Sequence, residues 1–257
     1  MSLLSISDDG AVRTVTLTHQ ERRNALGEAL LAQLLPAVED AQCRALILRA
    51  EPGVSTWSAG HDVDDLPTDG SDPLAWTSPV EHLVRAVRAA PFPVIAAVEG
   101  GAWGAACNLA FACDIIVATR DAQFAITPAK LGVPYHSEGV AQFLAAVSAP
   151  VARAMFFTAE PLRADSPQLA DTVQVVVGTS EELTAESERL ARRIASLAPL
   201  SIRAIKAEIN ALTDARPLTA DAFEQLTALR RRAWTSKDYA EGLAAFHERR
   251  AAEFTGE

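Results

Sequence analysis

Cysteine is scarce in this 257-residue sequence: Cys43, Cys107 and Cys113 are an odd number and lack the spacing of a metal site. Two of them lie in the apolar centre of the chain, so we expect free thiols in a reducing compartment. Basic residues are also few, with 23 Lys and Arg against 33 Asp and Glu. The resulting formal net charge of −10 argues against sequence-independent nucleic-acid binding, which needs basic side chains to displace counterions.

Long uninterrupted apolar runs are missing as well. The most apolar segment, residues 94–118, contains Glu99, Asn108 and Asp114, which disfavour a membrane-spanning helix. The first residues carry acids and no basic cluster, so no signal peptide is predicted. We therefore expect a cytoplasmic protein that binds neither membrane nor nucleic acid.

Patterns of strands and helices alternate through the first part of the sequence. Residues 3–7 and 12–18 alternate apolar and polar side chains around Asp8-Asp9-Gly10, which predicts a hairpin. The remaining predicted elements are buried strands at 44–50, 94–98 and 171–177, and helices at 27–41, 103–112 and 141–159, with another helix after Pro79. Pro36 predicts a kink or a break in the first helix. This alternation indicates an α/β fold with a largely parallel sheet.

The sequence divides into residues 1–180, a core of strands and helices, and residues 181–257, an almost wholly helical region. Pro199 and Pro217 separate that region into three or four predicted helices. Its apolar side chains need a surface to pack on, either the core or a neighbouring subunit; they are Leu226, Leu229, Trp234, Leu243 and Phe246. The polar segment from Pro67 to Pro79 predicts a mobile loop that could close over a site.

Two glycine-containing turns follow predicted strands. Ser58-Ala-Gly-His-Asp62 follows one strand, and the small residues from Gly100 to Asn108 follow another and lead into a buried helix. Ligands of α/β sheets bind at the carboxyl ends of strands. A helix that begins there offers unpaired backbone N–H groups, which suit an anion or a developing oxyanion.

These motifs resemble those of the crotonase superfamily, the enoyl-CoA hydratase and isomerase family, in the same order along the chain. The matching segments are Arg23-Asn-Ala-Leu26, Trp57-Ser-Ala-Gly-His-Asp62, Ala97-Val-Glu-Gly-Gly-Ala-Trp-Gly-Ala-Ala106, Cys113-Asp-Ile-Ile-Val-Ala118 and the region from Phe124 to Gly132. The resemblance implies a crotonase spiral of ββα units with a C-terminal helical region for packing and trimerisation. It also implies a homotrimer or dimer of trimers that binds an acyl-CoA thioester, with CoA as part of the substrate, no other cofactor and no metal.

By this resemblance, the thioester carbonyl is held by the backbone N–H groups of His61 and Ala105. The family usually has Gly at the second position, and Ala105 keeps the N–H group. The His61 imidazole either takes part in the chemistry or only fills space. The implied CoA-contacting residues are Arg23, Ala25, Ala59, Gly60, Asp62, Val63 and Arg249; Arg22 is a further candidate for the CoA phosphates.

Two departures from the family pattern bear on the reaction. Hydratases of the family use two glutamates to handle water, and this sequence has Asn108 and Pro128 at those positions. Without this carboxylate pair, addition of water to a double bond has no evident acid and base. The resemblance therefore does not support a standard hydratase, and a double-bond isomerase is disfavoured for the same reason.

Decarboxylation of a malonyl-type thioester needs an oxyanion hole and no base, because loss of carbon dioxide itself generates the enolate. The segment from Leu66 to Leu74 and the motif Leu131-Gly-Val-Pro-Tyr135 resemble those of the decarboxylases of the superfamily. The expected reaction is methylmalonyl-CoA to propionyl-CoA. By the same resemblance, Tyr135 and Thr127 lie in the pocket, where hydroxyl groups orient the substrate carboxylate.

Alternatives to these roles follow from the residue types. Tyr135 could be a core aromatic residue, and Thr127 could cap the helix that begins at Pro128. Glu138 lies on the loop where other superfamily members place catalytic acids, so it competes as an acid or base. A hydrolase or isomerase that uses Glu138, or a catalytically idle acyl-CoA-binding subunit, are the alternative functions.

Overall fold

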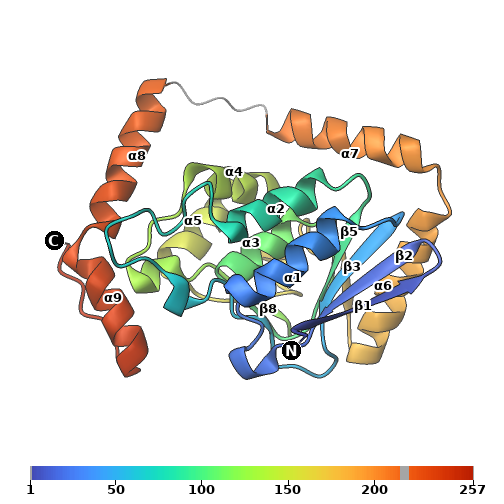
Figure 1. Ribbon diagram of the computed structural model, residues 1–257, viewed down its shortest axis with the longest axis horizontal. Helices are drawn as coiled ribbons and strands as arrows, with labels where there is room; N and C mark the ends of the chain where they lie inside the picture. The colour runs from blue at the N-terminus through green and yellow to red at the C-terminus, as the bar shows by residue number, and fades with distance from the viewer. Residues whose placement is uncertain (1, 215–219, 257) are drawn as a thin grey trace.

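The computed structural model describes residues 2–214 and 220–256, so Pro217 lies outside the described residues (Figure 1). Within this part of the chain, the strands form one sheet ordered β1-β2-β3-β5-β7-β10 and a smaller sheet ordered β4-β6-β8-β9. The strands are β1 (Leu4–Asp9), β2 (Val12–Leu17), β3 (Ala45–Ala50), β4 (Thr56–Ser58), β5 (Val94–Val98), β6 (Gly101–Trp103), β7 (Ile115–Thr119), β8 (Gln123–Ala125), β9 (Leu162–Arg163) and β10 (Val175–Val177).

Helices follow the strands in a regular order. They are α1 (Glu28–Glu39), α2 (Pro79–Ala89), α3 (Ala105–Ala112), α4 (Ser137–Ala146), α5 (Ala149–Thr158), α6 (Ser180–Ala195), α7 (Pro199–Thr213), α8 (Ala220–Trp234) and α9 (Lys237–Glu248). The runs β3-β4-α2, β5-β6-α3 and β7-β8-α4 each place one strand in the large sheet, the next in the small sheet, and a helix behind them. This is the predicted spiral of ββα units.

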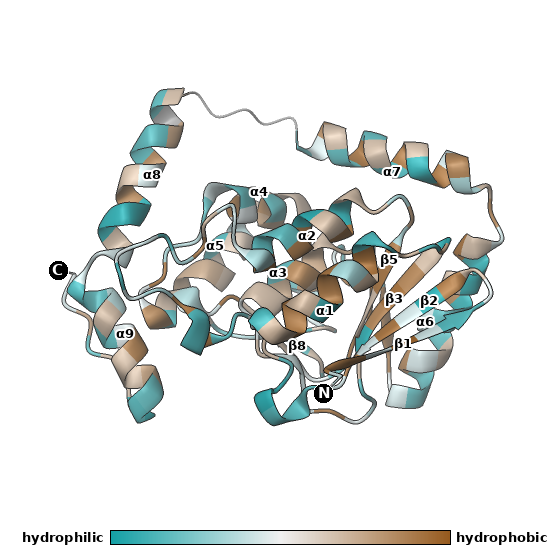
Figure 2. Ribbon diagram, in the orientation of Figure 1, coloured by the Kyte–Doolittle hydropathy of each residue, from teal (hydrophilic) through white to brown (hydrophobic). Residues whose placement is uncertain are grey.

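The central strands of the large sheet are covered on both faces, so β3 and β5 are buried throughout and apolar except for Arg49. Leu46 and Leu48 pack into the main core with α1, α2 and α3. Ile47 and Ile95 point to the other face, where α6 supplies Leu183. Hydrophobic residues accordingly run along β3, α1 and α3 (Figure 2). The predicted boundary at residue 180 remains a prediction, and α6 packs directly on the core sheet.

Several predicted elements are confirmed, and others differ in detail. The hairpin pairs Leu4 with Leu17 in antiparallel register, and β5 has the predicted bounds. Helix α1 continues through Pro36 to Glu39, so Pro36 does not break it. The single helix predicted over 141–159 is instead α4 and α5, because the backbone is extended at Val147 and Ser148. Pro150 suits the start of α5, where a missing N–H costs nothing.

The loop between residues 67 and 78 has neither helix nor strand, as predicted. It is nevertheless held by hydrogen bonds from the C-terminal helices α8 and α9, and Leu74 is buried. The contacts are Tyr239 Oη to Pro67 O (2.7 Å), Trp234 Nε1 to Gly70 O (3.0 Å) and Arg230 Nη2 to Asp72 Oδ2 (2.7 Å). Over residues 2–214 and 220–256, no helix has the length and apolarity to cross a membrane.

Candidate active site

Three neighbouring strands of the small sheet place the site. Strands β4, β6 and β8 run parallel, with Ser58 opposite Ala102 and Trp103 opposite Ala125. Their carboxyl ends therefore emerge side by side. The segments that follow are Ala59–His61 after β4, Gly104–Ala105 after β6 and Ile126–Thr127 after β8.

Gly60 brings the first two segments into contact. Its φ of +82° lies in the region that favours glycine, and a methyl group added there would collide with the carbonyl oxygen of Trp103. The same methyl would lie 3.1 Å from the amide nitrogen of Ala105. The turn that carries the His61 amide is thus packed directly against the amide of Ala105.

Helix α3 begins at Ala105 and points its amino end at this contact. Gly104 precedes it with φ +53°, and the first intrahelical bond runs from the Asn108 N–H to the Gly104 carbonyl (3.2 Å). The Ala105 N–H therefore has no acceptor within the helix. The Ala105 amide at the positive end of this short helix thus lies beside the turn that carries His61, and a helix end of this kind can stabilise an oxyanion.

The segment Arg23-Asn-Ala25 is hydrogen-bonded to the end of β4 and to the Ala59–His61 turn. The Ala59 N–H donates to the Arg23 carbonyl (2.9 Å), and Leu26 pairs with His61 as an isolated bridge. Buried Asn24 donates from Nδ2 to the carbonyl of Trp57 (2.9 Å). Ala25 is buried, whereas the Arg23 side chain is exposed. This motif therefore has a structural role in fixing the Ala59–His61 turn.

Thr127 faces the same turn and does not cap a helix. The short helix Pro128–Leu131 that follows receives no side-chain cap from Thr127. Instead, its Oγ1 lies 3.1 Å from the position that a methyl group on Gly104 would occupy. The hydroxyl is thus directed at the backbone that leads into the Ala105 amide.

Tyr135 lies on the loop before α4, in an aromatic cluster. Its ring stacks on the imidazole of His136, with centroids 5.4 Å apart, and meets the edges of Phe143 and Phe156. Among the described residues, its hydroxyl has no hydrogen-bond partner. Burial raises the pKa of Tyr135 well above its usual value, and the nearby Glu81 adds to this shift. The side chain is therefore a neutral phenol at physiological pH.

A cavity of about 1160 Å³ opens beside Tyr135. His136 and Glu138 also line it, Leu74 and Trp76 come from the loop over residues 67–78, and α8 contributes its apolar face. Tyr135 packs as well against the core cluster that contains Ala105. The lining of this cavity does not include His61, Ala105 or Thr127.

The two positions that hold glutamates in hydratases have different environments here. Asn108 is 1% exposed, and neither of its side-chain polar atoms has a partner among the described residues. It lies one turn along α3 from Ala105, so both share a helix face. Pro128 only begins the short helix after Thr127. The paired amides thus have an amide side chain near them and no carboxylate at either position.

Among the residues expected to contact CoA, Asp62 and Val63 lie on the loop after β4, and Arg249 lies at the end of α9. Arg22 is already paired, at 2.8 Å from Asp62 and 2.6 Å from Asp64, and Asp62 also accepts from the Asp64 N–H. Val63 packs on the apolar cluster of Leu66 and Leu74. Arg249 is exposed at the end of α9, two residues after His247, whose Nδ1 lies 3.9 Å from Asp64. The structure therefore brings the end of α9 to the loop that carries Asp62.

Sequence reasoning missed one buried pair beside the site. Glu81 and His136 are 3% and 6% exposed, and Glu81 Oε1 lies 3.0 Å from His136 Nε2. The only sequence signal for Glu81 is misleading, because Ser78-Pro-Val-Glu81 has the spacing of a capping box. Ser78 forms no such cap, and Glu81 turns into the protein.

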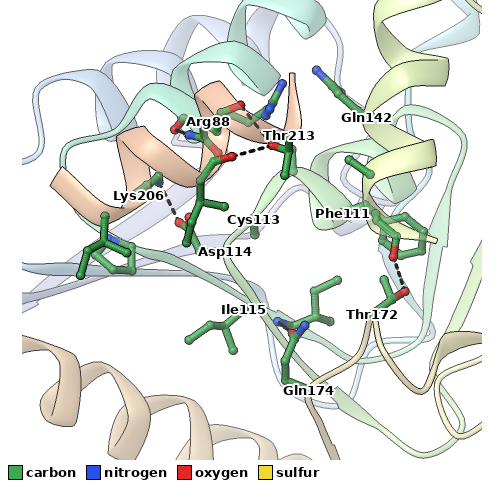
Figure 3. A pocket seen from close by; sticks show the side chains of 18 of the residues that line it. Arg88, Phe111, Cys113, Asp114, Ile115, Gln142, Thr172, Gln174, Lys206 and Thr213 are labelled. Carbon is green, nitrogen blue, oxygen red and sulfur yellow. Dashed lines mark hydrogen bonds and ion pairs between the residues drawn. The ribbon is translucent and has the colours of Figure 1, made fainter. Parts of the chain in front are cut away.

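A second cavity, of about 530 Å³, lies between α7 and the body of the protein (Figure 3). At its edge, Lys206 donates to Asp114 Oδ2 (2.7 Å) and to the carbonyls of Val87 (3.1 Å) and Phe92 (3.0 Å). This cavity holds none of the residues of the first. Over residues 2–214 and 220–256, no three His, Cys, Asp or Glu side chains are grouped to hold a metal ion.

A spiral of ββα units that directs two backbone amides at one point defines the class of crotonase-fold enzymes. The chain belongs to the enoyl-CoA hydratase/isomerase family, whose model matches residues 7–257. It is 34% identical over 248 residues to the methylmalonyl-CoA decarboxylase of Escherichia coli strain K12, covering 95% of each chain.

Other relatives share the fold. A solved structure of methylmalonyl-CoA decarboxylase in complex with 2-nitronate-propionyl-CoA has a TM-score of 0.96 and 32% identity, covering 100% of this chain and 99% of that chain. The 2,3-dehydroadipyl-CoA hydratase of Escherichia coli strain K12 is 30% identical over 266 residues, covering 100% of both chains. Similarity alone therefore includes both decarboxylases and hydratases.

Proposed function

We propose that this protein decarboxylates a short malonyl-type acyl-CoA thioester, with methylmalonyl-CoA as substrate and propionyl-CoA as product. The observation that carries the proposal is that the two backbone amides expected to hold the thioester oxygen occur together with the absence of both hydratase glutamates. The paired amides of His61 and Ala105 are kept, while Asn108 and Pro128 stand where a hydratase has its glutamates. This combination supports a reaction that generates an enolate without a base.

In the proposed reaction, the thioester oxygen accepts hydrogen bonds from the two amides. As the bond between C2 and the carboxylate breaks, its electron pair moves into the thioester and negative charge grows on that oxygen. Fixed N–H dipoles stabilise this charge because they need no reorientation when it develops. Carbon dioxide leaves, and the enolate carbon then takes a proton.

Tyr135 and Thr127 are proposed to orient the substrate carboxylate. A neutral hydroxyl can hold the carboxylate with its C–C bond across the thioester plane, where cleavage is favoured. It does so without the strong ion pairing that would stabilise the ground state as much as the transition state. Burial keeps the Tyr135 phenol protonated, which supports this role.

The test is product analysis by mass spectrometry after incubation with methylmalonyl-CoA, malonyl-CoA and crotonyl-CoA. We expect propionyl-CoA from methylmalonyl-CoA and negligible hydration of crotonyl-CoA. Efficient hydration would overturn the assignment. Release of free CoA would instead favour a hydrolase that uses Glu138, and binding of thioesters without any turnover would favour an idle acyl-CoA-binding subunit.

Tyr135→Phe provides the residue-level test of this proposal. Because the variant keeps the ring and loses only the hydroxyl, we expect methylmalonyl-CoA decarboxylation to fall by about 10- to 1,000-fold if orientation is its main contribution. A continuous propionyl-CoA assay measures the rate, and circular dichroism checks the fold. A fully active Phe variant would contradict the proposed role of the hydroxyl.

A further inference from the structure

The proposed reaction leaves an enolate carbon that must be protonated, and Glu138 is an acid in the wall of the cavity beside Tyr135. Glu138 lies in the first turn of α4, three residues after Tyr135, and both line the same cavity. Its Oε2 is buried and has no hydrogen-bond partner among the described residues. An ionised carboxylate left in this way would be costly, whereas a carboxylic acid that faces a ligand is not.

The buried pair Glu81 and His136 lies at the segment that carries both Tyr135 and Glu138. His136 Nδ1 accepts a hydrogen bond from the Gly139 N–H (3.1 Å), so the ring proton lies on Nε2. Nε2 lies 3.0 Å from Glu81 Oε1, in an orientation that makes no hydrogen bond. The imidazole thus lies between Glu81 of α2 and the start of α4, with Tyr135 stacked on its face.

The charges around Glu138 come from three directions. Burial raises the pKa of Glu138, and the carboxylate of Glu81 raises it further. Arg85 and Arg88 on α2, and His136 when it is protonated, act in the opposite direction. On the far side of the cavity, Arg230 of α8 is already paired with Asp72 at 2.7 Å. Glu138 therefore resists ionisation more than an ordinary glutamic acid.

We propose that Glu138 is the acid that protonates C2 of the enolate, and that Glu81, acting through His136, is its positioning residue. The inference rests on the proposed function. Carbon dioxide has already left; the Glu138 O–H bond then breaks, the C=C electron pair of the enolate takes the proton to form the C2–H bond, and a lone pair of the oxyanion restores the thioester C=O. Glu138 remains as a carboxylate and regains a proton from solvent.

Exchange of the C2 protons of propionyl-CoA in deuterated water tests this step separately, because protonation must run backwards through the same acid. We expect Glu138→Gln to slow this exchange, followed by NMR, by about 100- to 10,000-fold. Decarboxylation should fall less, since loss of carbon dioxide needs no acid. The matched control is Glu160→Gln, which changes an exposed glutamate and should leave both rates unchanged.

Glu81→Gln separates positioning from simple support of the fold. In exchange, Glu138 must first act as a base, so the rate rises with pH through its pKa. Loss of the Glu81 charge lowers that pKa and should move the rise to lower pH, whereas a merely structural role would lower the rate equally at every pH. Circular dichroism and Tm confirm that each variant is folded.

The outcomes distinguish the inference from the proposed function. Wild-type protein that decarboxylates methylmalonyl-CoA while Glu138→Gln exchanges as fast as Glu160→Gln overturns the role of Glu138 and leaves the function standing. Wild-type protein that decarboxylates yet exchanges no C2 proton overturns it equally. Glu138-dependent exchange in a protein that does not decarboxylate supports Glu138 as the acid and removes the proposed function.

Discussion

At the scale of single residues, Gly60 is the most constrained position of the site. It adopts a φ of +82° and lies against Trp103 and Ala105 with no room for a side chain. The motif Ser58-Ala-Gly-His-Asp62 therefore predicts this tight turn, because glycine is the residue that readily adopts its positive φ. At position 105, unlike at Gly60, a methyl side chain is tolerated. Ala105 stands where the family usually has glycine, and it keeps the backbone N–H group.

Ala105 allows the oxyanion hole to be tested through the backbone. Ala105→Pro removes one of the two amide donors, and loss of one such donor lowers the rate by about 100- to 1,000-fold. Ala105→Gly keeps the donor and should retain activity. The methylmalonyl-CoA assay measures both, with circular dichroism as the check on folding. A glycine variant as inactive as the proline variant would mean that the N–H group is not what matters.

The proposed site residues were predictable from the sequence to different extents. His61, Ala105 and Thr127 were predicted from the family resemblance of their motifs, and the parallel pairing of β4, β6 and β8 brings the segments that carry them side by side. Glu81 could not be predicted in this way, because it lies in the first turn of a helix where an acid usually faces solvent. Only the tertiary fold brings the residue before α4, His136, next to it.

At the scale of elements, the strand pattern was the most predictable part. Apolar runs such as β5 have one stable environment, a sheet covered on both faces. Helix ends were less predictable, since α1 tolerates Pro36 and the predicted 141–159 helix is interrupted at Val147 and Ser148. The short strand β6 was expected as a turn, and its pairing with β4 and β8 gives it strand geometry.

Helix α7 is attached by polar contacts more than by apolar burial. Lys206 is its only buried residue, and Asn210 Nδ2 donates to the Arg88 carbonyl (2.9 Å). Arg88 in turn pairs with Asp214 (2.6 Å), directly after the helix. The ion pair of Lys206 with Asp114 is visible at the edge of the cavity beneath α7 (Figure 3).

Lys206→Met should destabilise the protein because it leaves Asp114 and two carbonyl groups without their donor. Since the Asp114 side chain keeps 25% exposure and can be hydrated, we expect the free energy of unfolding to fall by about 1–3 kcal/mol. Urea denaturation followed by circular dichroism measures it. Arg203→Met, an exposed position on the same helix, is the control. Equal stability of the two variants would contradict the anchoring role of Lys206.

At the scale of the whole molecule, the C-terminal helices α7 and α8 carry large apolar side chains that are exposed in the single chain. On α7, Leu200 and Leu212 are 79% and 78% exposed, and hydrophobic residues recur along this helix (Figure 2). Apolar residues of α8, among them Phe223 and Leu229, are exposed as well. Contiguous surfaces of this kind on a folded chain indicate contact with another protein surface. The sequence left open whether the apolar side chains of this region pack on the core or on a neighbouring subunit. In the structure Trp234 and Leu243 are buried within the chain, whereas Leu226, Leu229 and Phe246 are exposed.

We propose that other copies of this chain cover these helices, as a trimer or a dimer of trimers. Light scattering after size exclusion should give a mass three or six times the chain mass of 27.3 kDa. Leu212→Glu places a charge on the exposed apolar face of α7, so burial against a partner would become unfavourable and smaller species should appear. Glu208→Gln on the same helix is the control and should keep the wild-type mass. A monomeric wild-type protein would contradict self-association and leave these helices to a different partner.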